Sequence, residues 1–491
     1  MQINSLTLIN YRKFEHQSFG FNRHFTALIG DNASGKTQIL NAIVKLLSQY
    51  QFKMLRLNTY RPSQEDEASP ENHCEITPED AHHETHFFAN PDGAHQLRQE
   101  PFFPVILSAT LDDGEYAFCR RDSEADEANA RSAYLTRLAT EALESVKSQQ
   151  EITLPVLAYY GTSRLWNKKN RPKTGVPSRT DGYRWSLDGF VDFDELKEWF
   201  RDQELIQLQK NTNGIVLKVM RKALAKMIEG CEDVFYDLEA KSIVLHFQAD
   251  AALPFEERSL LFEDLSDGYR MILTLVFDLV KQMFLLNPQL GYDTLEKTDG
   301  IVLIDELDLS LHPKWQRKVV DSLKETFPQV QFIVTTHSPF VLQSLEPGEV
   351  IDLESCTGEV LDEHWTALKQ AASEKSLCKN ECRHISSNDL TPGMAWPGPA
   401  AEYARKSVED VVEEVMQVEL PQRSERLTRM YNAAKEYYAL LEQAKDMPTD
   451  EIAKLKDRLD ELSAPFSQDV AYYAYLEFKR QMALGTKEVR K

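Results

Sequence analysis

Eight residues near the N-terminus have the pattern of a phosphate-binding loop. Residues 30–37 read Gly-Asp-Asn-Ala-Ser-Gly-Lys-Thr, which fits G-x-x-x-x-G-K-[ST]. Glycine permits the tight turn in which backbone N–H groups point at phosphate oxygens, and the helix that follows adds the positive end of its dipole. We expect Lys36 to reach the β- and γ-phosphates and the Thr37 hydroxyl to ligate Mg²⁺. The other expected phosphate contacts are Gly30, Asn32, Ser34 and Gly35.

Two acids, Asp305 and Glu306, directly follow the apolar run 301–304. Such a run is typical of a buried parallel strand, and ligands bind at the carboxyl ends of parallel strands. After a phosphate loop, this position predicts that Asp305 holds Mg²⁺ through water and that Glu306 is the general base for the attacking water. The alternative is a pair of solvated carboxylates at a strand end.

His337 follows a second apolar strand, predicted at 332–334. A lone histidine is most often structural. This one lies at a strand end after the two acids, so we predict that it senses the γ-phosphate and orients the water.

The segment 265–270, Leu-Ser-Asp-Gly-Tyr-Arg, precedes an apolar helix pattern. By itself, Ser-Asp-Gly is typical of a turn or of a helix N-cap. Between the phosphate loop and the two acids, we interpret it as a second anion site. Ser266 and the Gly268 N–H would then bind a γ-phosphate held by another subunit.

Periodicity predicts the elements that position these residues. Residues 24–29 form an apolar strand that runs into Gly30, and a helix follows Thr37. Residues 1–50 are expected to hold two strands, the loop and this helix. Further strands are expected at 154–160 and 349–353, with helices over 192–230. The chain is therefore predicted to be an α/β protein.

The order of these motifs resembles the ABC-type ATPase heads of the SMC, RecF and overcoming-lysogenisation-defect group. The opening Asn-Tyr-Arg-Lys-Phe at 10–14 is similar to the N-[FY]-[RK]-x-[FY] start of those heads, and the resemblance implies that Arg12 contacts nucleotide. It also implies an ABC-type P-loop head with mixed sheets, which hydrolyses ATP with Mg²⁺ in a head-to-tail dimer.

Two further stretches resemble ATPases of bacterial defence islands. Residues 305–313, Asp-Glu-Leu-Asp-Leu-Ser-Leu-His-Pro, look like an extended Walker B motif plus D-loop, and the resemblance makes Asp308 a nucleotide-site residue. Residues 159–166 also look like that group. The family that the chain resembles in most detail is the PtuA-like ATPases of Septu and retron antiphage systems. The ATPase resemblance covers about residues 1–50 and 155–355.

Composition narrows the class of protein. The chain has 491 residues, 42% of them hydrophobic, which is enough for a sizeable core. The formal net charge of −22 argues against a broad nucleic-acid-binding face, because phosphates repel an acidic surface. We find neither an apolar run of eighteen residues nor a signal peptide, and we expect a cytoplasmic protein with reduced cysteines.

We predict four regions. Residues 1–60 carry the first part of the ATPase lobe, and 61–150 form an acidic and polar insertion with a hairpin of 105–111 and 115–120. Residues 151–355 complete the ATPase, and 365–491 form a helical C-terminal region that docks a partner or packs on the ATPase itself. Its candidate helices are 403–418, 424–445, 449–462 and 466–484.

Basic and aromatic residues alternate from Arg164 to Arg184. This segment is the candidate for a local nucleic-acid contact, with cations for phosphates and aromatic rings for stacking. A lid over ATP and a solvated loop are the alternatives.

The C-terminal part shows no clear chemistry of its own. A nuclease of the Toprim type would carry a Glu-Gly and an Asp-x-Asp pair after Ser338, and we find no convincing pair. Cys378, Cys382 and His384 are an incomplete metal pattern, and His364 is a poor fourth ligand, so free thiols are favoured.

The resemblance implies a sensor or regulator of a separate HNH nuclease of the PtuB type in antiphage defence. In a retron, a reverse transcriptase and its RNA–DNA hybrid would be further partners. The alternatives are a RecF-like repair ATPase that acts at DNA gaps or ends, and a scaffold that binds ATP and turns over little.

Overall fold

The computed structural model describes residues 1–56, 75–89, 95–111, 116–123, 130–162, 164, 178–210, 214–248 and 258–354. The chain divides into two compact units, Met1–Lys406 and Ser407–Lys491. The second unit lies outside the described residues, as do the other residues of the predicted C-terminal helices and Cys378, Cys382 and His384.

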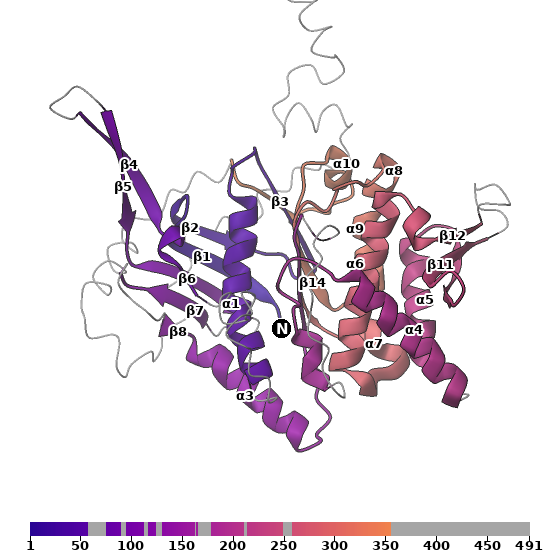
Figure 1. Ribbon diagram of the computed structural model, residues 1–491. Helices are drawn as coiled ribbons and strands as arrows, with labels where there is room; N and C mark the ends of the chain where they lie inside the picture. Colours follow the sequence, from indigo (N-terminus) through magenta and orange to yellow (C-terminus); the bar gives the residue numbers. More distant parts are fainter. Residues whose placement is uncertain are drawn as a thin grey trace, which may run out of the picture. The chain divides into compact units, whose positions relative to one another are not determined.

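A five-stranded parallel sheet carries the motifs (Figure 1). Its strands are short and apolar, and three of them are buried along their whole length, which is the expected pattern when both faces of a sheet are covered. Sequence-distant strands are neighbours in it, so the ends of β3, β13 and β14 meet at one edge. The order is β15 (Val350–Asp352), β3 (Phe25–Ile29), β14 (Val330–Thr335), β13 (Gly300–Ile304) and β9 (Val156–Tyr160).

A second sheet of five strands is antiparallel. Its first two strands are joined by the tight turn at Arg12 and Lys13, and β1 pairs along its other edge with β6. In order, the strands are β2 (Phe14–Gly20), β1 (Ile3–Tyr11), β6 (Val105–Leu111), β7 (Tyr116–Arg121) and β8 (Ala130–Arg131). A separate hairpin pairs β4 (His82–Ala89) with β5 (His95–Phe102).

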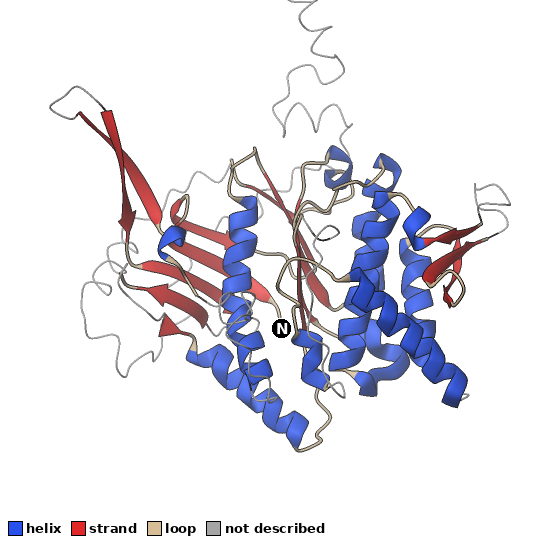
Figure 2. Ribbon diagram, in the orientation of Figure 1, coloured by secondary structure: helices blue, strands red, loops and turns tan. Residues whose placement is uncertain are grey.

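The helix α1 (Lys36–Arg56) lies between the two sheets (Figure 2). It contacts β6 and β7 of the antiparallel sheet and β9 and β14 of the parallel one. This position explains why α1 buries more than one side of its surface. The helix α3 (Ala133–Lys147) packs against it, and Ser132 caps α3 by accepting the N–H of Leu135.

A helical part covers the β9 side of the parallel sheet around the apolar helix α6 (Asp267–Leu286). Helices α4 and α5 pack on α6, and α5 also packs on α9. The elements of this part are α4 (Phe193–Lys210), α5 (Ile215–Met227), α7 (Thr294–Lys297), α8 (Pro313–Gln316), α9 (Val319–Thr326), α10 (Pro339–Leu342), β10 (Cys231–Asp237), β11 (Ser242–Phe247) and β12 (Ser259–Leu261). Short 3₁₀ turns complete the described chain: η1 (Pro78–Asp80), η2 (Arg179–Tyr183), η4 (Phe262–Asp264) and η5 (Pro288–Asp293).

The segment from 61 to 150 contributes directly to the N-terminal sheet. The expected hairpin forms as β6 and β7, but β6 also pairs with β1 over six residues. The sheet therefore needs this segment for its centre. The first fifty residues hold three strands where two were expected, because β1 and β2 form their own hairpin before β3.

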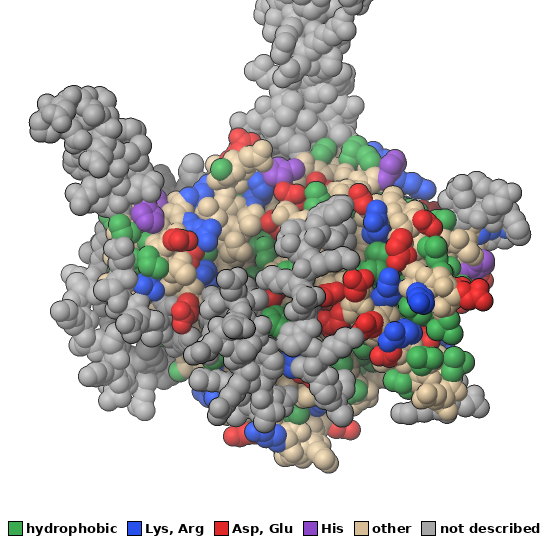
Figure 3. Space-filling view, viewed as in Figure 1, with side chains coloured by type: hydrophobic (Ala, Val, Ile, Leu, Met, Phe, Trp, Pro, Cys, Tyr) green, Lys and Arg blue, Asp and Glu red, His purple; other side chains and the backbone are tan. Residues whose placement is uncertain are grey.

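Acidic and basic side chains are interspersed over the helical part on the face drawn in Figure 3. The helical part contains ion pairs such as those of Lys222 with Glu296 and Lys318 with Glu229.

Candidate nucleotide-binding site

The phosphate loop connects β3 to α1, as the motif requires. Gly30 and Gly35 have φ angles of 137° and 100°, in a region that side chains rarely tolerate. A Cβ atom on Gly35 would lie 2.6 Å from the ring of Phe14. The turn between β1 and β2 thus covers the loop closely, and only glycine fits at this position.

Lys36 is folded back into the loop. Its Nζ donates to the carbonyl oxygens of Gly30 and Asp31, both at 2.8 Å, and its side chain is nearly buried. Burial lowers the pKa of Lys36, and nearby Asp305 opposes this shift. The ammonium therefore lies against the carbonyl oxygens of the loop that is expected to bind a phosphate.

Thr37 and Asp305 meet across the edge of the sheet. The Thr37 hydroxyl donates to both carboxylate oxygens of Asp305, at 3.1 and 2.9 Å. Asp305 is 4% exposed and also accepts the Thr335 hydroxyl at 2.6 Å. A hydroxyl and a carboxylate oxygen next to a phosphate loop form the hard oxygen donor set that Mg²⁺ prefers, so these residues fit the ion.

Glu306 has an unusual backbone for a residue with a side chain. Its φ is 50°, in the left-handed region. Its N–H donates to the Thr335 hydroxyl oxygen at 2.7 Å, and its carbonyl accepts from Arg164 at 3.0 Å. Its side chain is half-buried at the end of β13, where a general base for water would be placed.

Asp308 supports the turn that carries His337. It accepts the Thr336 hydroxyl at 2.6 Å and the His337 N–H at 3.3 Å. Ser338 caps α10 and donates its hydroxyl to Gln316 at 2.7 Å. His337 is exposed at the same edge of the sheet as Asp305 and Glu306. Asp308 thus has a structural role in this chain, apart from any contact with nucleotide.

Ser266 and Gly268 open α6, as predicted. Ser266 is exposed, and its side chain forms no cap within its own helix. Gly268 is buried against the D-loop, where an added Cβ would lie 2.7 Å from the Ser310 carbonyl oxygen. No hydrogen bond within the described ranges of this chain joins either residue to the phosphate loop.

Arg12 forms an ion pair with the buried carboxylate of Asp80. Its Nε and Nη2 donate to Asp80 at 3.0 and 2.8 Å. The neighbouring Lys13 reaches the phosphate loop instead, with Nζ 3.3 Å from the Ala33 carbonyl oxygen. In the motif at 10–14, the cation that contacts the phosphate loop is therefore Lys13, and not the expected Arg12.

The basic segment from Arg164 to Arg184 does not present its described arginines as a nucleic-acid surface. Arg164 is 2% exposed. Arg179 donates to the carbonyls of Leu286 and Ile152, and Arg184 pairs with Asp181 at 2.9 Å. The expectation is therefore wrong for Arg164, because a buried guanidinium cannot reach a phosphate backbone. Residues 165–177 lie outside the described part.

Sequence reasoning missed three contacts in this site. Thr335 holds both Asp305 and Glu306 by its hydroxyl. Arg164 bonds the backbone of the same two acids. Glu354 accepts the Asp31 N–H in the loop at 2.5 Å. Of Thr335, Arg164 and Glu354, only Arg164 could be singled out from the sequence, because it lies in the stretch 159–166 that resembles defence ATPases.

Among the described residues, no group of histidine, cysteine, aspartate or glutamate side chains has the arrangement of a metal site. The described helices include none that is long and apolar enough to cross a membrane.

Two family models match the chain. Residues 5–233 match a family described as "AAA domain", and residues 244–343 match one described as "AAA domain, putative AbiEii toxin, Type IV TA system". The two matches lie on either side of residues 234–243 and together include the phosphate loop, the start of α6, Asp305 and His337.

Two curated retron proteins are similar over most of the chain, and a Septu protein is similar over a shorter part. "Retron Vc95 probable ATPase" of Vibrio cholerae is 24% identical over 413 residues, 71% of this chain and 73% of that protein. "Retron Ec83 probable ATPase" of Escherichia coli is 26% identical over 428 residues, 71% of each chain. "Septu protein PtuA" of Bacillus mycoides is 48% identical over 88 residues, 18% of this chain and 12% of that protein.

Among solved structures, the SMC head bound to the C-terminal winged-helix domain of ScpA is similar. The alignment covers 72% of this chain and 94% of that chain, with 16% sequence identity and a TM-score of 0.35. The fold is a P-loop ATPase head of α/β class, with one parallel and one antiparallel sheet around α1.

Proposed function

We propose that this chain, a PtuA-like ATPase similar to the ATPases of retron and Septu systems, binds and hydrolyses Mg-ATP at the edge of its parallel sheet. The observation that carries the proposal is the contact of Thr37 with Asp305, next to Lys36 in the phosphate loop. It brings a phosphate-binding lysine and two oxygen ligands for Mg²⁺ together from opposite ends of the ATPase sequence.

Each residue has a separate role in this proposal. Lys36 and the loop amides hold the phosphates, with Gly30, Asn32, Ser34 and Gly35 lining the loop. Thr37 and Asp305 would hold Mg²⁺, which neutralises charge on the phosphate oxygens. Glu306 accepts a proton from the attacking water, and His337 contacts the γ-phosphate. Lys13 is better placed than Arg12 to add a cation beside the loop.

The site is proposed to be completed by a second copy of the chain. Ser266 is exposed at the start of a long helix, and among the described residues no hydrogen bond joins it or Gly268 to their own phosphate loop, which supports a role of this helix start toward the γ-phosphate of a partner. A head-to-tail dimer would form two such sites. Closure around ATP would then depend on the nucleotide.

The biological role follows from the relatives. We propose that the ATPase senses or controls infection in an antiphage system and regulates a separate HNH nuclease. A reverse transcriptase with its RNA–DNA hybrid would be a further partner in a retron. Residues 365–491 are the proposed docking region for the effector, and residues 407–491 within them form the second compact unit.

The first test is the substitution Lys36→Ala in the full chain. Removing the ammonium should abolish measurable ATP binding by calorimetry and steady-state hydrolysis with it, because the Lys36 Nζ is held against the loop carbonyls of Gly30 and Asp31, where the phosphates would bind. Lys53→Ala, farther along α1, is the matched control and should bind ATP like the wild type. Equal ATP affinity in the Lys36 variant and the wild type would defeat the assignment. ATP binding without turnover in the wild type would favour a scaffold.

A further inference from the structure

Arg164 contacts the backbone of both acids at the end of β13. Its Nη1 donates to the Asp305 carbonyl oxygen at 2.7 Å, and its Nη2 donates to that of Glu306 at 3.0 Å. A third bond, from Nη1 to the Gly161 carbonyl at 2.9 Å, ties the guanidinium to the end of β9. A buried arginine must be paired, and this one uses carbonyl oxygens.

Hydrogen bonds hold the Glu306 backbone on both sides of its Cα. Thr335 accepts its N–H, and Arg164 donates to its carbonyl. Between these two bonds lies a Cα with φ of 50°, a conformation that persists only when its surroundings enforce it. The backbone angle sets the direction of the Glu306 side chain, so Arg164 contributes to where the carboxylate points.

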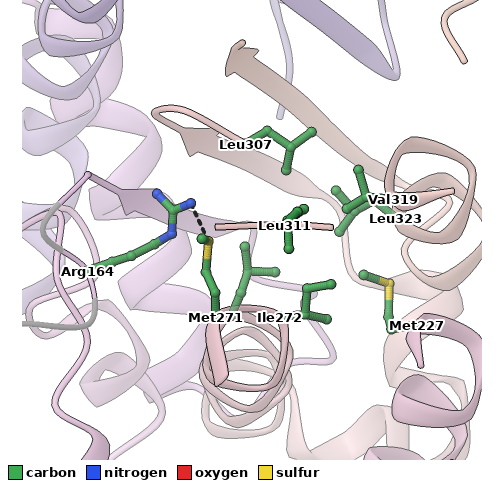
Figure 4. Close-up of a pocket in the computed structure, with 9 residues that line it drawn as sticks. Arg164, Met227, Met271, Ile272, Leu307, Leu311, Val319 and Leu323 are labelled. Carbon is green, nitrogen blue, oxygen red and sulfur yellow. Dashed lines mark hydrogen bonds between the residues drawn. The ribbon is translucent and has the colours of Figure 1, made fainter. Parts of the chain in front are cut away.

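The same guanidinium contacts the helix α6, which begins after Ser266. In Figure 4, the Arg164 side chain extends toward Met271, and its Nη2 lies 2.6 Å from the sulfur. Met271 is in the first turns of α6, close to Ser266 and Gly268. The neighbouring space is lined by apolar side chains and measures about 10 Å³, roughly the size of one water, so the guanidinium has little room to move.

We propose that Arg164 is a positioning residue for ATP hydrolysis, which holds the Glu306 backbone in its strained conformation and joins it to the start of α6. A shift of α6 on engagement with a partner's nucleotide would then be passed to the residue that activates water. This inference rests on the proposed function, because it requires Glu306 to be the base.

The test uses Arg164→Lys in the full chain. Lysine keeps the charge, but it lacks the planar fork that bonds two carbonyls at once. We expect kcat to fall by about a hundredfold, the effect of a small misplacement of a catalytic group, while the affinity for Mg-ATP stays unchanged. Arg164→Gln, which retains an N–H donor, is the second variant if the lysine variant does not fold. Wild-type kcat in a folded variant would overturn the inference.

Arg179→Lys is the matched control. Arg179 also bonds backbone carbonyls, those of Leu286 and Ile152, both at 2.8 Å, but none at the nucleotide site. Its replacement should leave kcat at the wild-type value, whatever it does to the melting temperature. If Arg179→Lys lowers kcat as much as Arg164→Lys, the effect of Arg164 is one of general stability and the inference is wrong.

A double variant separates this inference from the proposed function. If Arg164 acts through Glu306, adding Arg164→Lys to Glu306→Gln should cause no further loss beyond Glu306→Gln alone. A further loss of about a hundredfold would show that Arg164 acts elsewhere. If Glu306→Gln itself hydrolyses ATP normally, the assignment of the base fails and the inference fails with it. If Glu306→Gln is inactive and Arg164→Lys is fully active, only the inference fails.

Discussion

Thr37 and Asp305 are 268 positions apart in the chain, yet their side chains are in hydrogen-bond contact. The contact depends on Thr335, which fixes one oxygen of Asp305 from the neighbouring strand. Each of these residues comes from the end of a different parallel strand or from the helix after one. The residues of the site come together because β3, β14 and β13 are neighbours in the parallel sheet and end at the same edge.

Thr335→Val tests this arrangement at a single hydroxyl. Valine has almost the same shape but leaves the Glu306 N–H without its acceptor and removes one of the two hydroxyl donors to Asp305, the other being that of Thr37. We expect a loss of stability of about 1–3 kcal/mol and a strong loss of kcat. Melting temperature and steady-state hydrolysis measure the two effects.

Thr326→Val is the control for that substitution. Thr326 is equally buried, but its hydroxyl has no hydrogen-bond partner in the described part of the chain, so valine should cost nothing or stabilise the fold. Equal effects of the two substitutions would mean that the Thr335 hydroxyl holds neither acid.

At the scale of elements, Asp80 joins three pieces of the N-terminal lobe. It is 1% exposed and pairs with Arg12 of the β1–β2 turn and with Lys45 of α1, at 2.8 and 2.9 Å. It also caps η1 through the Thr77 N–H at 2.9 Å. Burial alone would raise the pKa of Asp80, but Lys45 and the hydrogen bonds hold it below its ordinary value.

Asp80→Ala should therefore destabilise the lobe. Removing one partner of a buried ion pair costs about 3–5 kcal/mol. Because the pKa is lowered in the folded state, this stabilisation is fully present at neutral pH and is lost only as the pH falls through the folded pKa. The melting temperature at pH 7 should drop clearly. Asp293→Ala breaks an exposed pair with Lys297 and should change it little. Similar shifts for both variants would contradict this account.

Local patterns predict the strands and helices that carry the motifs, because apolar runs and helical periodicity are local. They do not predict that β6 pairs with β1, because that pairing joins distant segments through an antiparallel edge. Nor do they predict the burial of Arg164, since a basic residue at the head of a basic run is normally exposed. The sequence predicts Lys36, Thr37 and Asp305 together because they belong to motifs that bind phosphate and Mg²⁺. Thr335 belongs to no such motif.

At the scale of the whole molecule, the described residues form an ATPase head, and residues 407–491 form a second unit. The sequence of that unit is rich in tyrosine, at 431, 437, 438, 472, 473 and 475, the kind of residue enriched at interfaces. We propose that the head is the part regulated by nucleotide and that the second unit binds the effector.

Deletion of residues 407–491 should separate these two activities. The shortened chain should bind ATP as the full chain does, but should no longer co-purify with the nuclease expressed from the same operon. Lys36→Ala in the full chain is the complementary variant, which should keep the second unit and lose ATP binding. Retention of the nuclease at full stoichiometry by the shortened chain would place the docking surface on the head.

The most direct test of the central claim is the behaviour of Glu306→Gln with Mg-ATP. The variant should bind ATP, hydrolyse it at least about a hundredfold more slowly in a single turnover, and accumulate as an ATP-bound dimer measured by light scattering. Adding Ser266→Arg to this variant should abolish the dimer and leave ATP binding intact. Hydrolysis at the wild-type rate by Glu306→Gln would contradict the account, because another residue would then activate the water.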